Sequence, residues 1–359
     1  MAKFYKIKVK DLIRETDDCT SIAFDIPETL VKEFEYKQGQ YLTLRQKING
    51  EDVRRSYSVC SSPLDEELRV AVKKIEGGKF STFANDVLQV GDEIEAMPPM
   101  GKFYTEVIED QSKNYVAFAA GSGITPIISI IKTVLKTERN STFTLFYLNK
   151  NVANIIFKEE LEGLRNQHLE RFQVFYNLTK AKLDVDLFFG RYNEEKLETF
   201  FTKLINPSEV DEFFLCGPEE MIFLVRDALL NRSIDSKKIH FELFTSPDAE
   251  KSMPNFAKAI KAKTEVSAVS VKEDGKTILF DLPFKSDNIL DAALNNGADL
   301  PYACKGGVCC TCKAKLIEGE VDMIVNYALE PEEVEAGFIL TCQCYPLTEK
   351  VVIDFDQAL

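Results

Sequence analysis

The sequence predicts a multidomain chain with three modules: an antiparallel β-barrel, an α/β parallel sheet and a small C-terminal α+β module. Residues 1–105 hold six short alternating segments and no long helix. From about residue 111, strand-like and helix-like segments alternate, and six of the nine cysteines lie between Cys304 and Cys344. At roughly 150 residues per domain, 359 residues suit two or three domains. We expect domains at 1–108, 109–245 and 263–359, with a linker at 246–262.

Composition narrows the classes of function. The chain is 45% hydrophobic, which excludes a disordered protein. No run approaches the ~18 apolar residues that a membrane span needs, and the start alternates and turns acidic, unlike a signal peptide. We therefore expect a cytoplasmic protein. The net charge of −14 argues against nucleic-acid binding, which needs clustered Lys and Arg.

The first module is predicted from period-two alternation interrupted by turn residues, which is typical of short barrel strands. The expected strands are Phe4–Val9, Ser21–Ile26, Tyr41–Leu44, Ser56–Val59, Leu68–Val72 and Glu93–Ala96.

Two motifs in this module suit a flavin nucleotide. One is Arg55-Ser-Tyr57-Ser58, and the other is Gly78-Lys79-Phe-Ser81-Thr82, with Ser81 expected as a helix N-cap. Singly, each is more often a solvated strand end or an ordinary turn into a helix. Together they offer an aromatic ring, a cation and a helix N-terminus, which binds phosphate through free amides. Tyr57 would face the flavin ring, and Arg55 and the Ser81 helix would face the phosphates.

The second module opens with the buried-strand run Tyr115–Ala120. It is followed by the turn Gly121-Ser122-Gly123-Ile-Thr125-Pro126 and an apolar helix-like segment, Ile127–Leu135. Strand, glycine turn and helix form the context of a nucleotide-binding turn. Pro126 suits the first helical position, with Thr125 as N-cap.

Further alternation predicts a parallel sheet covered by helices. Strands are expected at Thr142–Leu148, Gln173–Asn177 and Glu212–Leu215, and helices at Lys158–Arg165 and Glu194–Leu204. The last strand leads into Cys216-Gly217-Pro218-Glu-Glu-Met221 and a helix to about Asn231. Ligands lie at the carboxyl ends of such strands, so Cys216 is open to two interpretations, a core position and the edge of a cofactor site.

The third module carries Cys304-Lys-Gly-Gly-Val-Cys309-Cys310-Thr-Cys312 and a distant Cys342. This C-x4-C-x2-C…C spacing is that of plant-type [2Fe–2S] sites. A zinc site is the alternative, but zinc usually takes paired C-x2-C knuckles or Cys/His mixtures. Cys344 leaves the fourth ligand open, and Cys310 and Cys344 are otherwise expected to be small buried hydrophobes.

The flanks of this segment predict a small β-rich fold. Val266–Val271 and Thr277–Leu282 form a hairpin signal, Ile289–Asn296 a short helix ended by Gly297, and Lys350–Asp354 a last strand.

Together these motifs resemble the ferredoxin–NADP⁺ reductase superfamily across essentially the whole chain, in the layout of oxygenase reductases with a C-terminal β-grasp ferredoxin domain. The resemblance implies FAD, a [2Fe–2S] cluster held by Cys304, Cys309, Cys312 and Cys342, and NAD(P)H as donor. It also implies that Tyr57 stacks on the flavin, Ser58 lies near its N5, and Val72 and Lys73 line the flavin nucleotide. Cys216, Glu242 and Phe244 would lie beside the nicotinamide and flavin.

The nucleotide preference depends on the residues after the second strand of this module. An acidic residue there suits NADH, whereas a basic one suits the 2′-phosphate of NADPH. Asn149-Lys150-Asn151 contains no acidic residue, so NADPH is favoured.

Three segments are similar to the reductase components of ring 1,2-phenylacetyl-CoA epoxidases: Ala303–Thr311, Asn326–Pro331 and Gly337–Gln343. This implies an enzyme that passes electrons from NAD(P)H through FAD and the cluster to diiron epoxidase subunits. We expect it to be a monomer or weak oligomer. The alternatives are a reductase for a steroid or aromatic-ring hydroxylase or for hybrid-cluster protein, and a redox-sensing regulatory protein.

Acidity is concentrated at the C-terminal end. Residues 264–359 contain 17 Asp and Glu but 7 Lys and Arg, so most of the net negative charge lies there. Such a surface increases solubility and can also steer a basic partner. We expect an acidic docking face on the ferredoxin domain.

Overall fold

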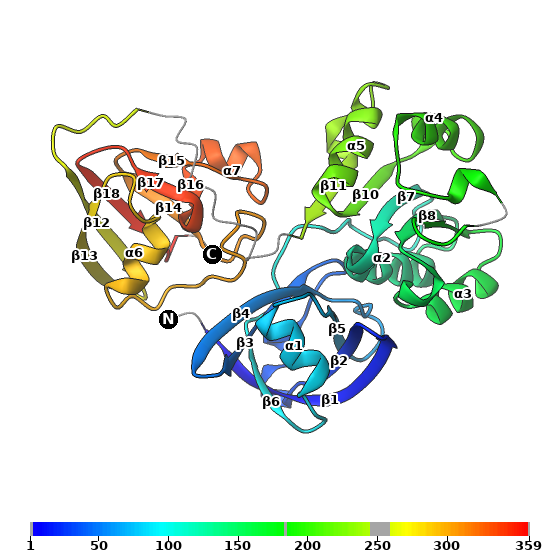
Figure 1. Ribbon diagram of the computed structural model, residues 1–359, viewed down its shortest axis with the longest axis horizontal. Coiled ribbons are helices and arrows are strands. Elements are labelled where there is room, and N and C mark those ends of the chain that lie inside the picture. Colours follow the sequence, from blue (N-terminus) through cyan, green and yellow to red (C-terminus); the bar gives the residue numbers. More distant parts are fainter. Residues whose placement is uncertain (1–2, 183–184, 245–258, 358–359) are drawn as a thin grey trace. The chain divides into compact units, whose positions relative to one another are not determined.

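The computed structural model describes residues 3–182, 185–244 and 259–357 (Figure 1). They form two compact units, one made mainly of Tyr5–Val53 and Tyr57–Phe244 and the other mainly of the chain after Phe244. Most of the expected linker, 246–262, lies outside the described residues. Within the described part, none of the helices combines the length and apolar character that crossing a bilayer requires.

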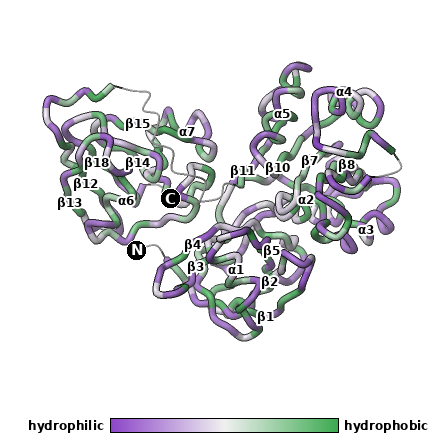
Figure 2. Tube along the Cα trace, viewed as in Figure 1, coloured by the Kyte–Doolittle hydropathy of each residue, from purple (hydrophilic) through white to green (hydrophobic). Residues whose placement is uncertain are grey.

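The first module is an antiparallel six-stranded sheet in the order β4-β3-β6-β1-β2-β5. A bridge between Val59 and Val70 connects its two outer strands and closes the barrel. Alternate apolar side chains fill the interior, and Figure 2 shows the alternation of hydrophilic and hydrophobic residues along β1. The strands are β1 (Tyr5–Thr16), β2 (Cys19–Asp25), β3 (Tyr41–Ile48), β4 (Glu51–Ser58), β5 (Leu68–Lys73) and β6 (Glu93–Ala96).

All six expected barrel strands are confirmed, but two details were wrong. Strand β1 is 12 residues long, because a register shift between Val9 and Asp11 breaks the alternation without ending the strand. Helix α1 (Lys79–Asp86) begins after Gly78, so Ser81 is its third residue and not the N-cap. The Ser81 hydroxyl instead accepts a hydrogen bond from the Ile75 amide at 3.3 Å.

The second module is a parallel five-stranded sheet in the order β11-β10-β7-β8-β9. Helices α2 and α3 pack on the face that carries Tyr115, Ala117 and Ala119. The opposite face carries Phe118, whose ring packs edge-on against Phe201 of α4. The strands are β7 (Asn114–Ala120), β8 (Thr142–Asn149), β9 (Phe172–Leu178), β10 (Glu212–Gly217) and β11 (Ile239–Leu243); the helices are α2 (Ile124–Thr137), α3 (Lys158–Gln167), α4 (Glu194–Lys203) and α5 (Glu219–Leu230).

The expected α/β alternation is confirmed, with one correction at the glycine turn. Residues Gly121–Gly123 form a 3-10 turn that continues directly into α2 at Ile124. Thr125 is therefore inside the helix, where its hydroxyl donates to the Ser122 carbonyl at 3.0 Å, and Pro126 is the third helical residue. Proline is tolerated there because first-turn amides have no partner within the helix.

The third module contains a five-stranded sheet in the order β13-β12-β18-β14-β16 and a two-stranded sheet, β15-β17. The expected hairpin is confirmed, since β12 pairs with β13 around Asp274 and Gly275, which both have positive φ angles. The strands are β12 (Val266–Glu273), β13 (Lys276–Pro283), β14 (Lys313–Glu318), β15 (Val321–Met323), β16 (Phe338–Leu340), β17 (Cys344–Pro346) and β18 (Lys350–Asp354); the helices are α6 (Ile289–Asn295) and α7 (Pro331–Glu335).

Candidate functional site

Tyr57 and Ser58 end strand β4 in the barrel. The Tyr57 ring lies 5.4 Å from the buried Phe80 ring of α1, centroid to centroid, so α1 supports one side of Tyr57. Ser58 is buried, and Val72 and Lys73 end the strand β5. Lys73 also forms an ion pair with Asp18, with 3.6 Å between charged atoms. Arg55 lies on β4 as well, and its Nη1 donates to the Arg54 carbonyl at 2.7 Å.

Helix α1 begins directly after Gly78. Neighbouring side chains come so close to Gly78 that a side chain at this position would clash with them. A Cβ added there would lie 2.4 Å from the Ser81 hydroxyl and 2.5 Å from Ile75 Cγ1. Thr82 is in the first turn, and Lys79 pairs with Glu51 at 2.5 Å. The first-turn amides are the groups that can bind a phosphate.

Asn85 is a functional candidate that the sequence reasoning missed. Its Nδ2 donates to the Val72 carbonyl at 2.9 Å and to the Ser81 carbonyl at 2.8 Å, and its Oδ1 accepts from the Thr20 hydroxyl at 2.9 Å. This buried amide therefore attaches α1 to strand β5. A single asparagine inside a helix carries no pattern by which it could have been found.

The nucleotide turn and the Cys216 motif are in direct contact. A Cβ added to Gly123 would lie 2.2 Å from the Cys216 carbonyl oxygen, so only glycine fits this approach. Gly217 has a φ of +156°, and an added Cβ would lie 2.9 Å from both Ala120 Cβ and Met221 Cε. The structure thus brings Gly121–Pro126 and Cys216–Met221 to the same edge of the sheet, as the strand order requires.

A carboxyl group completes this site. Glu242 on β11 pairs in register with Cys216 on β10, and the Ser58 hydroxyl donates to Glu242 Oε2 at 3.0 Å. Burial raises the pKa of Glu242 to about 7, although the Ser58 hydrogen bond favours its charged form. Burial also raises the pKa of Cys216 well above its usual value, and the charge of Glu242 adds to this rise. Phe244 follows β11 and is 40% exposed.

Polar atoms without protein partners lie at the carboxyl ends of β8 and β9. Among the described side chains, Asn151 Oδ1 and Asn177 Oδ1 are buried and accept no hydrogen bond. Buried polar groups are normally hydrogen-bonded, so these acceptors suit a polar ligand such as a ribose. Lys150, which directly precedes Asn151, is exposed.

The cysteines of the third module form two pairs. Cys309 Sγ lies 3.1 Å from Cys304 Sγ, and this hydrogen bond, together with backbone amides, lowers the pKa of Cys304 to about 6. The Gly306 amide donates to Cys304 Sγ at 3.3 Å. Cys312 is hydrogen-bonded with Cys342, and Gln343 Nε2 donates to Cys342 Sγ at 3.8 Å.

This paired arrangement fits a two-iron cluster. Residues 3–182, 185–244 and 259–357 contain no group of three or more side chains placed around a single metal ion. A [2Fe–2S] cluster needs two thiolates on each iron, which two buried pairs can supply, and amides directed at sulfur stabilise the thiolate. Gly307, at φ +75°, allows the close turn, because a Cβ there would lie 2.8 Å from the Val325 carbonyl oxygen.

The two extra cysteines lie outside these pairs. Cys310 Sγ donates to the Ala328 carbonyl at 3.1 Å, and Cys344 is fully buried in the core. All nine cysteines are free thiols.

Comparisons with known proteins agree with all three modules. Residues 6–104 match the oxidoreductase FAD-binding domain, 118–227 the oxidoreductase NAD-binding domain, and 271–347 the 2Fe–2S iron–sulfur cluster binding domain. The chain is 41% identical to the E component of 1,2-phenylacetyl-CoA epoxidase from Escherichia coli K12, covering 99% of both chains. It is 33% identical to the ferredoxin reductase component of 3-ketosteroid-9-alpha-monooxygenase from Rhodococcus rhodochrous, covering 97% of this chain and 96% of the relative.

The fold is also shared with a solved structure. Phthalate dioxygenase reductase superposes with a TM-score of 0.59 at 22% identity, covering 98% of each chain. The domain content and the full-length identity identify an oxidoreductase that uses FAD, NAD(P)H and a [2Fe–2S] cluster. The chain therefore belongs to the ferredoxin–NADP⁺ reductase-like family of oxygenase reductase components with a C-terminal [2Fe–2S] ferredoxin domain.

Proposed function

We propose that this protein delivers electrons from NADPH to the diiron subunits of a phenylacetyl-CoA epoxidase, and so serves phenylacetate degradation. The full-length identity of 41% to the E component of such an enzyme is the observation that carries this choice of partner. Steroid and aromatic-ring hydroxylases and hybrid-cluster protein are the alternative acceptors, and a 33% identical ketosteroid reductase represents the first of these.

The contact between Ser58, Glu242 and the Cys216 motif supports a hydride-transfer site at this place. When bound, FAD supplies the change from two-electron to one-electron transfer, and the cluster supplies one-electron delivery. Tyr57 would pack against the flavin ring, and the hydrogen-bonded Ser58 and Glu242 would lie at its reacting edge. Cys216 and Glu242 line the nicotinamide side, with Phe244 at the rim.

The remaining contacts to the cofactors follow from the same placement. Arg55, Val72 and Lys73, together with Gly78, Lys79, Ser81 and Thr82 at the start of α1, hold the flavin nucleotide. Gly121, Ser122, Gly123, Thr125 and Pro126, with Gly217, Pro218 and Met221, hold the nicotinamide nucleotide. The pair Cys304 and Cys309 would hold one iron of the cluster, and the pair Cys312 and Cys342 would hold the other.

The preference for NADPH over NADH rests on Lys150 and its uncharged neighbours. Asn149 and Asn151 bring no negative charge that would repel a 2′-phosphate, and Lys150 is exposed and available to pair with one. Lys150→Glu should reverse the preference, seen as a larger kcat/KM with NADH than with NADPH. If wild-type protein already uses NADH better, this assignment is wrong.

We also propose the organisation of the molecule. Its flavin, nucleotide and ferredoxin domains occupy 1–108, 109–245 and 263–359, joined by a linker at 246–262, and it acts as a monomer or weak oligomer. We also propose a cytoplasmic location, because reducing conditions suit nine cysteines that form no disulfide.

Purified protein tests the proposal directly. We expect visible absorbance of flavin and iron–sulfur, FAD and iron in the preparation, and NADPH-driven reduction of cytochrome c. Adding diiron epoxidase subunits with phenylacetyl-CoA should then couple NADPH oxidation to epoxide formation. A colourless protein after reconstitution would overturn the electron-transfer role. Reduction of cytochrome c without coupling to the epoxidase would overturn only the choice of partner.

A regulatory redox sensor is the second function to separate. Such a protein would carry the same cofactors but turn over slowly. Steady-state NADPH oxidation with an artificial acceptor distinguishes the two, because a reductase sustains many turnovers per second whereas a sensor does not.

A further inference from the structure

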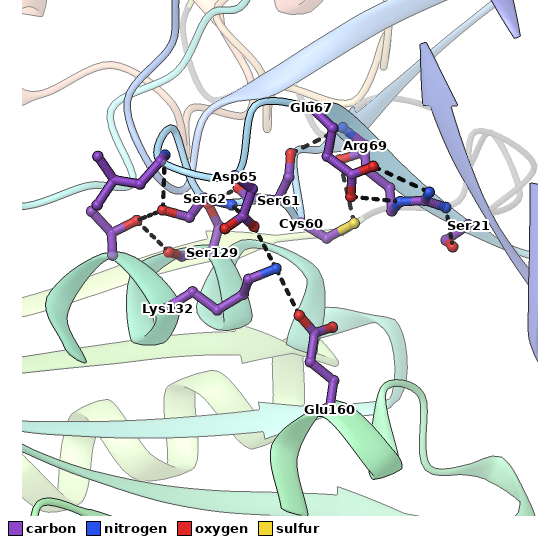
Figure 3. A network of polar contacts seen from close by, with 12 residues as sticks. Ser21, Cys60, Ser61, Ser62, Asp65, Glu67, Arg69, Ser129, Lys132 and Glu160 are labelled. Carbon is purple, nitrogen blue, oxygen red and sulfur yellow. Dashed lines mark hydrogen bonds and ion pairs between the residues drawn. The ribbon is translucent and has the colours of Figure 1, made fainter. Parts of the chain in front are cut away.

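A polar network connects the loop between β4 and β5 with helix α2 (Figure 3). Lys132 on α2 reaches Asp65 Oδ2 at 2.5 Å and Glu160 Oε1 of α3 at 2.6 Å. The Lys132 and Asp65 side chains are only 13% and 9% exposed. Lys136, one turn further along α2, also pairs with Asp65. One ammonium group thus bridges carboxylates from the barrel and from a second helix.

Hydroxyl groups strengthen the same junction. The Ser129 hydroxyl on α2 donates to the Ser61 carbonyl at 2.6 Å, and the Ser62 and Thr133 hydroxyls lie 2.8 Å apart. The Ser62 amide donates to Asp65 Oδ2 at 2.8 Å, which folds the loop around the carboxylate that receives Lys132. All of these bonds are buried or partly buried, so water competes weakly for them.

The connected segments are those that carry the two cofactor sites. Ser61 follows Ser58 by three residues, and Ser129 follows Pro126 by three residues, within one helix that begins at the nucleotide turn. A packed helix moves as a rigid element, so a shift of α2 at Lys132 also moves Gly121–Pro126. The distance between strand β4, which ends at Ser58, and the nucleotide turn Gly121–Pro126 therefore depends on the contacts of Lys132.

We infer that Lys132 is a positioning residue for hydride transfer. It touches neither proposed cofactor site. It holds α2 against the Ser61–Asp65 loop, and thereby holds the nicotinamide turn at the distance at which the hydride is transferred. The inference rests on the proposed function of the two sites.

The partners of Lys132 explain why this position is sensitive. Asp65 is held as a carboxylate, because Lys132, Lys136 and the Ser62 amide lower its pKa against the opposing effect of burial. Removing the ammonium group leaves two neighbouring carboxylates from different elements, which then repel each other, and the mostly buried Asp65 loses its main counter-charge. The two elements should separate at this point.

Anaerobic stopped-flow measurement of flavin reduction by NADPH, in full-length holoprotein, tests the role. Lys132→Met should lower the limiting rate constant by about 10–100-fold, because a displacement of about 1 Å can cost that much. The FAD content should stay at the wild-type level. Lys132→Arg should recover most of the rate, since a guanidinium can bridge both carboxylates.

Arg139→Met is the matched control. Arg139 follows α2 and pairs at 3.5 Å with Glu109, but both side chains are more than two-thirds exposed. Such a pair contributes little, so this variant should keep the wild-type rate constant within about twofold.

Two further variants keep the test decisive. Asp65→Asn combined with Lys132→Met removes the repulsion between the carboxylates, so thermal stability should return. Flavin reduction should remain slow, because the ion pairs that hold α2 against the Ser61–Asp65 loop are still missing. Recovery of the rate together with stability would overturn the inference and make Lys132 merely structural. If Lys132→Met fails to fold, Ser129→Ala should still slow reduction several-fold with full FAD content, and a wild-type rate there would also overturn it. A wild-type protein whose flavin NADPH cannot reduce would instead contradict the proposed function.

Discussion

The Ser58 hydroxyl donates a hydrogen bond to Glu242 Oε2 at 3.0 Å, although the two residues are 184 positions apart in the chain. One lies at the end of barrel strand β4, and the other lies on β11 at the edge of the parallel sheet. The bond therefore joins the two halves of the proposed hydride-transfer site. Because burial raises the pKa of Glu242 to about 7, its charge changes within the physiological pH range.

Flavin reduction should depend on the ionisation of Glu242. A carboxylate beside the nicotinamide stabilises the positive charge that develops as the hydride leaves, so the rate constant should rise with pH through about 7. Glu242→Gln should remove this pH dependence and lower the rate at pH 8 by about 10–100-fold. Stopped-flow traces from about pH 5.5 to about pH 9 measure both effects. An unchanged pH profile in the variant would assign the titration to another group.

The same carboxyl should make stability depend on pH. Its pKa is about 7 in the folded state and 4.5 as the ordinary value, so ionisation opposes folding as pH rises through this window. Glu242→Gln avoids that cost, which we expect to be about 1–2 kcal/mol for this half-buried group. The melting temperature of the variant minus that of wild type should be about 2–6 °C larger at pH 8.5 than at pH 5. Thermal unfolding at both pH values checks the sign, and a reversed sign would contradict the raised pKa.

Gly123 should tolerate no side chain. In Gly123→Ala the added Cβ would overlap the Cys216 carbonyl oxygen, so the nucleotide turn must move away from the sheet. We expect the KM for NADPH to rise by about tenfold or more, with FAD still bound.

Gly163→Ala is the control for this substitution. Gly163 lies within helix α3 with no atom within 4 Å of an added Cβ. It should leave KM unchanged and stabilise the protein by about 0.5–1 kcal/mol. Equal effects of the two alanines on KM would exclude a special role for the Gly123 contact.

Substitution of a cluster ligand should distinguish cytochrome c reduction, which needs the cluster, from ferricyanide reduction, which needs only the flavin. Cys309→Ser removes one of the paired thiols, so we expect iron content and cytochrome c reduction to fall by about 100-fold. NADPH-driven reduction of ferricyanide by the flavin should continue. Cys310→Ser is the matched control, because Cys310 Sγ donates to a backbone carbonyl and the side chain packs at the edge of the core. The Cys310→Ser variant should retain its iron. Loss of iron from this variant would mean that Cys310 replaces one of the four proposed ligands.

Acidic residues in the ferredoxin domain should make partner transfer sensitive to salt. Raising NaCl from about 50 to about 300 mM shortens the Debye length and weakens steering between an acidic face and a basic partner. Electron transfer to the oxygenase should slow several-fold, whereas ferricyanide reduction should change little. If salt slows both reactions equally, the acidic surface has no steering role.

Local pattern was sufficient for most of the fold. The barrel strands and the strands β7 to β10 could be predicted because their alternating or continuous apolar residues reflect one or two buried faces. Strands β15, β16 and β17 were missed, since three residues are too few to show a period. The starts of α1 and α2 were wrong because a glycine and a 3-10 turn, rather than a side-chain cap, precede them.

The site was predictable in its motifs but not in its long-range contacts. Cysteine spacing and glycine turns carry their chemistry within about ten residues. The Lys132–Asp65 pair joins segments 67 positions apart, and Asn85 reaches Thr20 across 65 positions. Single polar residues of this kind become recognisable only when the tertiary structure brings their partners together.

The position of β11 at the edge of the parallel sheet also has a consequence for biosynthesis. Domains generally fold in the order in which they emerge from the ribosome, so the barrel can form early. Glu242 arrives on the last strand of its sheet, after about two-thirds of the chain has been made. A nascent barrel that already holds flavin thus lacks the carboxyl group that completes the site. The Ser58–Glu242 contact can therefore form only after every strand of the parallel sheet has been synthesised.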